Sequence, residues 1–156
     1  MTYAGDRVIY DADGHIMELP THLRDFADPD VRDGIPLTNY SASSVTDEEV
    51  AVLVDQGGKH SEAHISRLLS LGDGLIAESK EIQALGAFDG QHRSQAMDML
   101  GFKKQIIFST LSAKAPFSTK LNTRLKYGAI RAHTRAMTAF CEHDDRLMGM
   151  ACISLD

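Results

Sequence analysis

Three apolar runs along the chain have the length that β-strands require. The first starts at residues 8–10 and continues through the alternating stretch DADGHI. The second is KKQIIFSTL at residues 103–111, and the third is RLMGMACISLD at residues 146–156. Short, nearly continuous apolar runs are typical of strands buried in a sheet. We therefore predict three strands, spread from the start of the chain to its end.

Helical patterns fill the intervals between these runs. Residues 89–101 begin with a capping aspartate, carry an apolar face and reach a helix stop at Gly101. A longer helical pattern extends from about residue 119 to residue 143. The order strand, helix, strand, helix, strand is typical of parallel βαβ units, so the sequence predicts an α/β fold.

Residues 21–88 form a long excursion after the first strand, and we predict little regular strand in it. The segment TDEEVAVLVDQ has the capping-box pair Thr46 and Glu49 and is followed by two glycines, which indicates a helix. Apolar residues at helical spacing follow in HSEAHISRLLSLGDG. We expect a single domain over residues 1–156, with the excursion inside it.

Composition and charge narrow the class of protein. A length of 156 residues with 43% hydrophobic and 24% charged residues suits one globular domain with a core. The net charge of −6 and the absence of a Lys/Arg cluster argue against a nucleic-acid partner. The sequence has neither a signal-peptide pattern nor a membrane-length apolar run, so we expect a cytoplasmic protein with no membrane partner. Cys141 and Cys152 lie within apolar patterns, and we expect both to be reduced.

The stretch YDADGHIMELP places acids and a histidine where the first strand ends. Side chains two residues apart leave the same face of a strand, so we expect Asp11, Asp13 and His15 on one side. A carboxylate oxygen and an imidazole nitrogen together suit Zn²⁺, and Mn²⁺ when more oxygen ligands join them. The residues alone leave two interpretations open: a metal-ligand pair, or a strand-end cap beside a hydrogen-bonded histidine.

Three segments of the chain resemble the amidohydrolase superfamily, in the branch related to aminocarboxymuconate semialdehyde decarboxylase and γ-resorcylate decarboxylase. DADGHIMELP looks like the opening strand of that branch. FDGQHRSQAMDMLGFKKQIIFSTLS is similar to its first helix and second strand, and AFCEHDDRLMGMACISLD to a helix end, a D-R turn and the third strand. The resemblance covers residues 8–20 and 88–156, in the order that the family has.

The resemblance implies the N-terminal part of a (β/α)₈ TIM barrel, about three βα units, with a metal at the C-terminal ends of the strands. Asp13 and His15 match the first-strand ligands, although the commonest form of the family has histidine at both positions. The implied cofactor is a divalent ion, Zn or Mn. The implied function is metal-dependent hydrolysis or decarboxylation of a small-molecule substrate. Because the family's other ligands and catalytic groups lie on later strands, we expect an incomplete portion that is inactive alone.

Asp11, Glu18 and Arg93 are the candidates for binding substrate or supporting the ligands. Asp11 matches an acidic position that precedes the ligand pair. Glu18 either holds the loop after the strand or faces the substrate. Arg93 matches a helix-start arginine of the family, and its guanidinium either clamps a substrate carboxylate or forms an ion pair within the scaffold. Ser109 and Thr110, near the end of the second strand, are further candidates for lining a pocket.

A second class of function stays open beside the enzyme. The chain can also be a noncatalytic α/β interaction module that pairs with another chain, and a homo-oligomer is compatible with either function. His60 and His64 have the i, i+4 spacing of a metal pair, but their polar, glycine-flanked surroundings make this a weak candidate. We expect His133 to be packed or hydrogen-bonded on a helix face. The sequence identifies neither the substrate nor whether the reaction is hydrolysis or decarboxylation.

Overall fold

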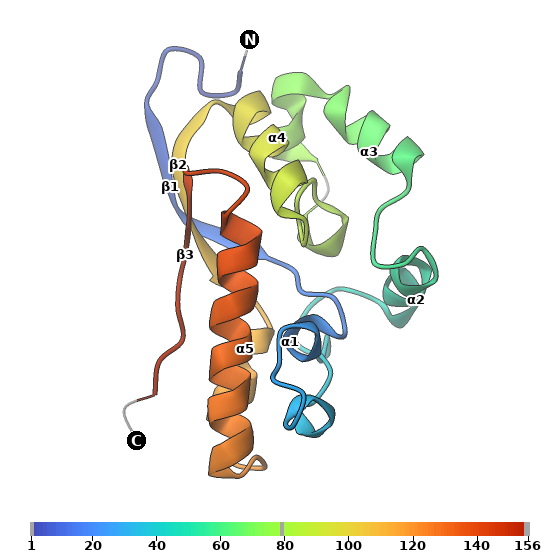
Figure 1. Ribbon diagram of the computed structural model, residues 1–156. Coiled ribbons are helices and arrows are strands. Elements are labelled where there is room, and N and C mark those ends of the chain that lie inside the picture. Colours follow the sequence, from blue (N-terminus) through green and yellow to red (C-terminus); the bar gives the residue numbers. More distant parts are fainter. Residues whose placement is uncertain (1, 79, 155–156) are drawn as a thin grey trace.

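A parallel three-stranded sheet lies at the centre of the computed structural model, which describes residues 2–78 and 80–154 (Figure 1). Its strands are β1 (Ile9–Ile16), β2 (Phe102–Ser109) and β3 (Leu147–Gly149), in the order β1-β2-β3. Both neighbouring pairs are parallel. The predicted α/β fold with parallel βαβ units is therefore confirmed, as an open sheet.

The connections between the strands are helical. Between β1 and β2 lie α1 (His22–Asp25), η1 (Arg32–Gly34), α2 (Asp47–Asp55), α3 (Glu62–Leu69), η2 (Gly72–Ala77), η3 (Glu81–Gln83) and α4 (Gly90–Leu100), where η marks a 3₁₀ turn. Between β2 and β3 lie η4 (Ser112–Phe117) and α5 (Thr123–Cys141). In the part of the excursion that the structure describes there is no strand, as predicted.

Capping side chains fix where the helices begin. Thr46 and Glu49 form the predicted capping box of α2, each accepting a hydrogen bond from the backbone N–H of the other. Asp89 caps α4 by accepting from a backbone N–H of the first turn. Asn122 does the same for α5, which therefore begins at Thr123 rather than near residue 119.

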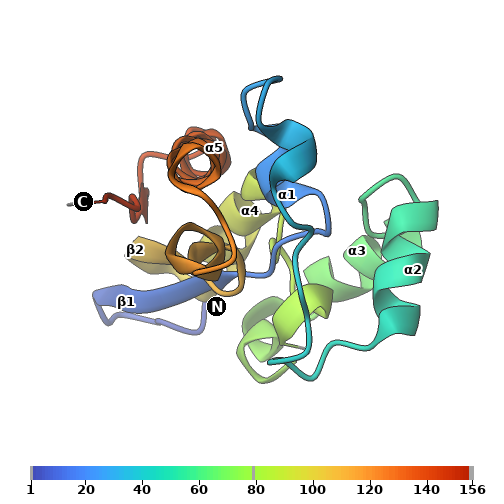
Figure 2. The same ribbon diagram turned by 90° about the horizontal axis from the view of Figure 1, so that it is seen from below.

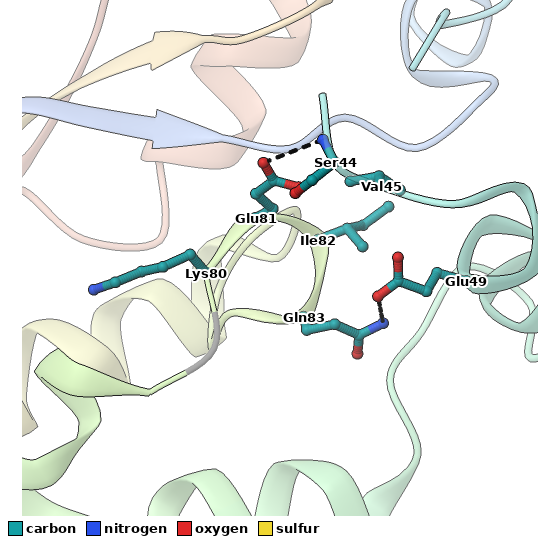
Figure 3. Close-up of a pocket in the computed structure, with 7 residues that line it drawn as sticks. All are labelled: Ser44, Val45, Glu49, Lys80, Glu81, Ile82 and Gln83. Atoms are coloured by element: carbon teal, nitrogen blue, oxygen red, sulfur yellow. Dashed lines mark hydrogen bonds between the residues drawn. The ribbon is translucent and has the colours of Figure 1, made fainter. Parts of the chain in front are cut away.

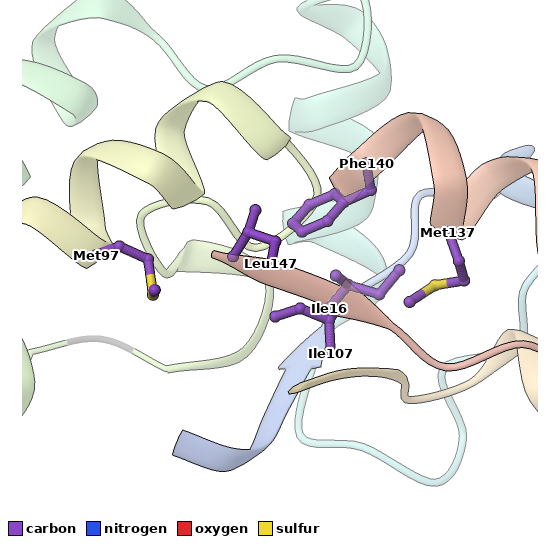
Figure 4. Packing of buried hydrophobic residues seen from close by; sticks show 6 residues of the cluster. All are labelled: Ile16, Met97, Ile107, Met137, Phe140 and Leu147. Carbon is purple, nitrogen blue, oxygen red and sulfur yellow. The ribbon is translucent and has the colours of Figure 1, made fainter. Parts of the chain in front are cut away.

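The helices α4 and α5 lie on one side of the sheet (Figures 1 and 2), and the main hydrophobic core fills the space between them and the strands. Ile16 and Ile107 come from neighbouring strands and are 1% and 0% exposed. Figure 4 shows the cluster, which consists of Ile16, Met97, Ile107, Met137, Phe140 and Leu147. Removing this apolar surface from water is the main force that holds the helices on the sheet.

The opposite face of the sheet carries the residues that alternate with the core positions. Because Ile107 points into the core, its neighbours Ile106 and Phe108 point to the other side. Met148 is opposite Ile106 in the strand register and is 41% exposed. The ring of His15 stacks on Phe108, with 5.6 Å between ring centroids, so His15 lies on this same face.

Strand β3 is shorter than the apolar pattern at residues 146–156 predicted. Three residues of it, Leu147–Gly149, pair with β2, and Met150 adds one further hydrogen bond from its N–H to the carbonyl of Ile107. Residues 151–154 are not in a strand, and residues 155–156 lie outside the described residues. A strand extends only as far as a neighbouring backbone pairs with it, which an apolar pattern does not reveal.

The structure also bears on the expected reduced cysteines and on the expected absence of a membrane-spanning segment. Cys141 and Cys152 are both free thiols, as predicted. Burial raises the pKa of each thiol, so both are protonated at neutral pH. Among residues 2–78 and 80–154, no helix is long and apolar enough to cross a membrane.

Replacing Ile107 with alanine tests whether the core between the sheet and the helices α4 and α5 stabilises the fold. We expect the Ile107→Ala variant to lose about 2–5 kcal/mol of unfolding free energy, because the side chain is fully buried and leaves a cavity. Urea unfolding followed by circular dichroism measures this loss. The control is Val8→Ala, at a side chain that is 69% exposed and should change the free energy little. Equal effects in both variants would contradict the assigned core.

Candidate functional site

A bulge in β1 brings Asp13 and His15 to the end of the strand. Between Asp11 and Gly14 a step of three residues on β1 matches a step of two on β2. Gly14 lies so close to Gln105 that a Cβ there would meet its side chain at 2.7 Å, so any larger residue would displace the Gln105 side chain. The two predicted ligands meet: Asp13 Oδ1 lies 3.3 Å from His15 Nε2.

Asp11 does not join this pair. Its Oδ2 accepts a hydrogen bond of 2.5 Å from Nε2 of Gln105 on the neighbouring strand. Its Oδ1 accepts from the backbone N–H of Asp13 at 3.0 Å, a short local turn at the bulge. Asp11 therefore supports the backbone that carries Asp13, rather than converging with Asp13 and His15 as the alternation of side chains predicted.

The hydrogen bonds of Thr110 fix the proton on the His15 ring. The Thr110 hydroxyl donates to the carbonyl of Ile16 at 2.6 Å, so its oxygen can only accept from His15 Nδ1, which is 3.2 Å away. Nδ1 of a neutral His15 therefore carries the proton, and Nε2 presents a lone pair toward Asp13. Two acceptor atoms 3.3 Å apart do not attract each other directly, but both can bind one shared group such as a metal ion.

The geometry of this pair fits a metal ion. Two ligands that each lie about 2.1 Å from one ion, at a tetrahedral angle, are about 3.4 Å apart. The side chains are accessible, with 91% of Asp13 and 46% of His15 exposed. Among the described residues, no group of three or more His, Cys, Asp or Glu side chains converges on one point. Asp13 and His15 are thus two candidate ligands.

Arg93, in the first turns of α4, anchors the backbone of β1 next to this pair. Its Nη2 donates to the carbonyl of His15 at 2.6 Å, and its Nε donates to the carbonyl of Gly86 at 2.9 Å. Gly86 has a φ of 73°, and a Cβ there would meet the Arg93 backbone at 2.4 Å. Burial lowers the pKa of Arg93 to about 10, against the opposing effect of Asp11, so the guanidinium stays charged at neutral pH.

Glu18 joins the ends of β1 and β2 from inside the protein. Its side chain is 0% exposed and accepts from the backbone N–H groups of Leu111, at 3.1 Å, and Ser112, at 2.9 Å. The Ser112 hydroxyl donates a third bond at 2.7 Å. Such charge-assisted bonds offset the cost of burying a carboxylate. The structure places Glu18 behind the strand ends, and its carboxylate holds the loop after β2.

His22 and His133 lie near the buried Glu18 carboxylate. The sequence did not indicate that these two histidines would be close to it. His133 Nε2 lies 2.7 Å from Ser109 Oγ, so His133 is hydrogen-bonded, as predicted. The other ring nitrogen of His133 and Nε2 of His22 have no partner among the described residues. Burial lowers the pKa of both imidazoles, and Glu18 opposes this shift in each. Both rings are therefore neutral at neutral pH.

A hollow of about 470 Å³ lies over Asp13 and His15. Arg93 and Thr110 line it, together with Lys80 and Glu81 from the excursion, which the sequence had not indicated. Glu81 is the non-glycine residue at which the described backbone has a positive φ, 56°. Nothing in the local sequence marks Lys80 or Glu81, because only the folding of the excursion brings them to the end of β1.

The wall formed by the excursion is held by its own hydrogen bonds. Behind it lies a second hollow of about 340 Å³, shown in Figure 3. There the Ser44 hydroxyl donates to Glu81 at 2.7 Å, and the Gln83 amide donates to Glu49 at 3.2 Å. His60 and His64, the other candidate metal pair, form hydrogen bonds with the backbone of this segment. Nε2 of His60 lies 2.8 Å from the Ile82 carbonyl, and Nε2 of His64 lies 2.9 Å from the Gln83 carbonyl.

Replacing Glu18 with glutamine tests the junction of the two strand ends. The Glu18→Gln variant keeps the size of the side chain but turns an acceptor into a donor beside buried N–H groups. We expect a loss of about 2–3 kcal/mol of unfolding free energy, measured by urea unfolding. The control is Glu62→Gln on the exposed first turn of α3, which should change stability little. A Glu18→Gln variant as stable as its control would show that the junction is unimportant.

The buried histidines predict that the fold weakens in mild acid. Their folded-state pKa values lie below the ordinary value of about 6.5, so the unfolded chain binds more protons as the pH falls. Their contribution to stability is therefore complete above about pH 6.5 and declines below it. Urea midpoints between about pH 7.5 and about pH 5 measure the slope. We expect His133→Asn to reduce that slope, and a slope unchanged by this substitution would contradict the assignment.

Comparison of the chain with protein-family models, with curated proteins and with solved structures found no match in any of the three. The resemblance described above therefore depends on the quoted motifs alone. The chemistry of the site depends on the atoms of Asp13, His15 and their neighbours.

Proposed function

We propose that this chain is the N-terminal part of a metal-dependent hydrolase or decarboxylase of the amidohydrolase type, in which Asp13 and His15 bind a Zn or Mn ion. One observation carries the proposal. The Thr110 hydroxyl leaves His15 with a lone pair on Nε2, and a carboxylate oxygen lies 3.3 Å from it. Two acceptors at this separation make a poor surface pair and a good pair of metal ligands.

The position of the pair in the fold supports the proposal. Asp13 and His15 lie near the C-terminal end of a parallel strand, which is where barrel enzymes place their catalytic groups. His15 is on the face of the sheet opposite α4 and α5. In a closed barrel that face becomes the interior. We propose that the three βα units are part of such a barrel.

The side chains around the pair have separate tasks in this proposal. Thr110 sets the tautomer of His15, and Asp11 supports the backbone of Asp13. Arg93 holds the backbone of His15, and its charge favours an anionic group in the hollow. A divalent ion bound here supplies a Lewis acid that polarises a carbonyl or carboxylate oxygen, or activates a water molecule. A small carboxylic acid, ester or amide is the substrate class that suits these groups.

The number of ligands limits what this chain does alone. Catalytic zinc sites use three protein ligands and keep one position open, whereas Asp13 and His15 provide two. We propose that another segment or chain supplies the remaining ligands and the catalytic acid or base. We expect metal binding by the isolated chain to be weak and its catalysis to be absent.

A noncatalytic interaction module is the second candidate function. The observation that favours it is the apolar surface opposite the core: Tyr10 is 66% exposed, Met148 41% and Met150 45%. Exposed apolar patches of this kind are typical of surfaces that pair with another protein. In this alternative the sheet face is the binding surface, and Asp13 and His15 contribute solubility rather than chemistry.

Metal binding separates the two candidates. We expect the chain to bind Zn²⁺ or Mn²⁺ at one site per chain, measured by titration calorimetry, and the Asp13→Ala and His15→Ala variants to lose about tenfold or more in affinity. Removing one of two ligands leaves a single bond, which is the physical reason for so large a loss. Matched controls are Asp145→Ala and His143→Ala, which remove exposed side chains of the same types elsewhere.

The contrary outcome is equally specific. Metal affinity that is unchanged in the Asp13→Ala and His15→Ala variants would sink the proposed ligand pair. A metal-free chain that forms a monodisperse oligomer in size-exclusion chromatography with light scattering would favour the interaction module.

A further inference from the structure

A second cavity, of about 400 Å³, lies outside the candidate metal site. It is bounded by α1, by residues 36–42 of the excursion and by the loop that follows β2. One part of its wall is apolar, formed by Leu23, Leu37 and Leu111. The volume is within the range of pockets that hold small organic molecules, about 300–1,000 Å³.

Two lysines, Lys114 and Lys120, line the same cavity. Neither ammonium group has a hydrogen bond or an ion pair within residues 2–78 and 80–154, whereas five arginines of the chain do pair with carboxylates. Other lysines of the described residues, such as Lys103 and Lys104, also lie outside the ion pairs, so the relevant feature of Lys114 and Lys120 is that both line one cavity. They make this cavity an attractive site for an anion.

The neutral polar groups of the cavity also present donors. Asn39 Oδ1 already accepts from the backbone N–H of Ser41 at 2.8 Å, which leaves the amide N–H₂ of Asn39 for a ligand. Ser118 Oγ accepts from the backbone N–H of Lys120 at 3.3 Å, so its hydroxyl proton is available to donate. Asn39 and Ser118 therefore keep a donor for an anionic headgroup, whereas the Thr38 and Ser112 hydroxyls donate within the protein, to the Leu19 carbonyl and to Glu18.

We propose that this cavity binds a small amphiphilic anion, that is, a carboxylate or phosphate headgroup on an apolar body. Lys114 and Lys120 hold the headgroup, with Asn39 and Ser118 as further donors. The apolar body lies against Leu23, Leu37 and Leu111. The site is separate from Asp13 and His15, and the two cavities meet at Ala42, which lines both.

The test compares octanoate with 1-octanol, which has the same apolar chain but no charge. Binding to the full chain is measured by ¹H–¹⁵N chemical-shift titration in metal-free buffer, so the outcome does not depend on the proposed metal function. We expect octanoate to bind at least about tenfold more tightly than 1-octanol, with shifts centred on residues 36–42 and 111–120, because each charged hydrogen bond adds to the affinity.

Charge reversal identifies the residues responsible. We expect Lys114→Glu and Lys120→Glu each to weaken octanoate binding about tenfold and to leave 1-octanol unaffected. The matched control is Lys103→Glu on β2, which makes the same charge change at an exposed position outside the cavity. Leu37→Ser should weaken both ligands, and the amide spectrum of each variant shows that it folds.

Two results would overturn the proposal. Equal affinity for octanoate and 1-octanol would show that no anion site exists. If Lys103→Glu and the two cavity variants lost octanoate affinity equally, the overall charge of the chain, and not this cavity, would explain the binding. Octyl phosphate, which carries an eight-carbon chain like that of 1-octanol, distinguishes a phosphate headgroup from a carboxylate when it is titrated in the same way.

Discussion

The buried carboxylate of Glu18 is the constraint on which the arrangement of the strand ends depends. A carboxylate without access to water must be met by hydrogen-bond donors, and the donors here are the backbone N–H groups of Leu111 and Ser112 and the Ser112 hydroxyl. These groups belong to the turn that follows β2, more than ninety residues away in sequence. The requirement to satisfy one charge therefore brings the exits of β1 and β2 together.

That junction lies next to the residues that position His15 of the candidate metal site. Thr110 immediately precedes the backbone that Glu18 holds, and its hydroxyl bridges the Ile16 carbonyl and the ring of His15. Arg93 fixes the same strand from the opposite side through the His15 carbonyl. Both supports act on His15, and Asp11 holds the backbone N–H of Asp13, so the fold positions the His15 ring and the Asp13 backbone.

The sequence allowed prediction of those features that depend on local pattern. Capping residues such as Thr46 and Asp89 marked the helix starts, and the apolar runs marked the parallel strands. The spacing of Asp13 and His15 indicated that they would meet. The prediction that the Asp11 side chain lies beside Asp13 and His15 was wrong. A bulge between Asp11 and Gly14 interrupts the alternation of side chains along β1. The predicted length of β3 was also wrong, because a strand ends where its backbone pairing ends rather than where the apolar pattern ends.

Features that depend on distant segments had no local signal. Lys80 and Glu81 reach the hollow because the long excursion folds back over the end of β1, and Lys114 meets residues 36–42 only in three dimensions. The central claim concerns one nitrogen atom: His15 Nε2 carries the lone pair that binds metal. Recording the ¹⁵N resonances of the His15 ring while Zn²⁺ is added tests it most directly. The account predicts that Nε2 shifts on coordination while Nδ1 keeps its proton; a shift of Nδ1 instead, or no change at either nitrogen, would contradict it.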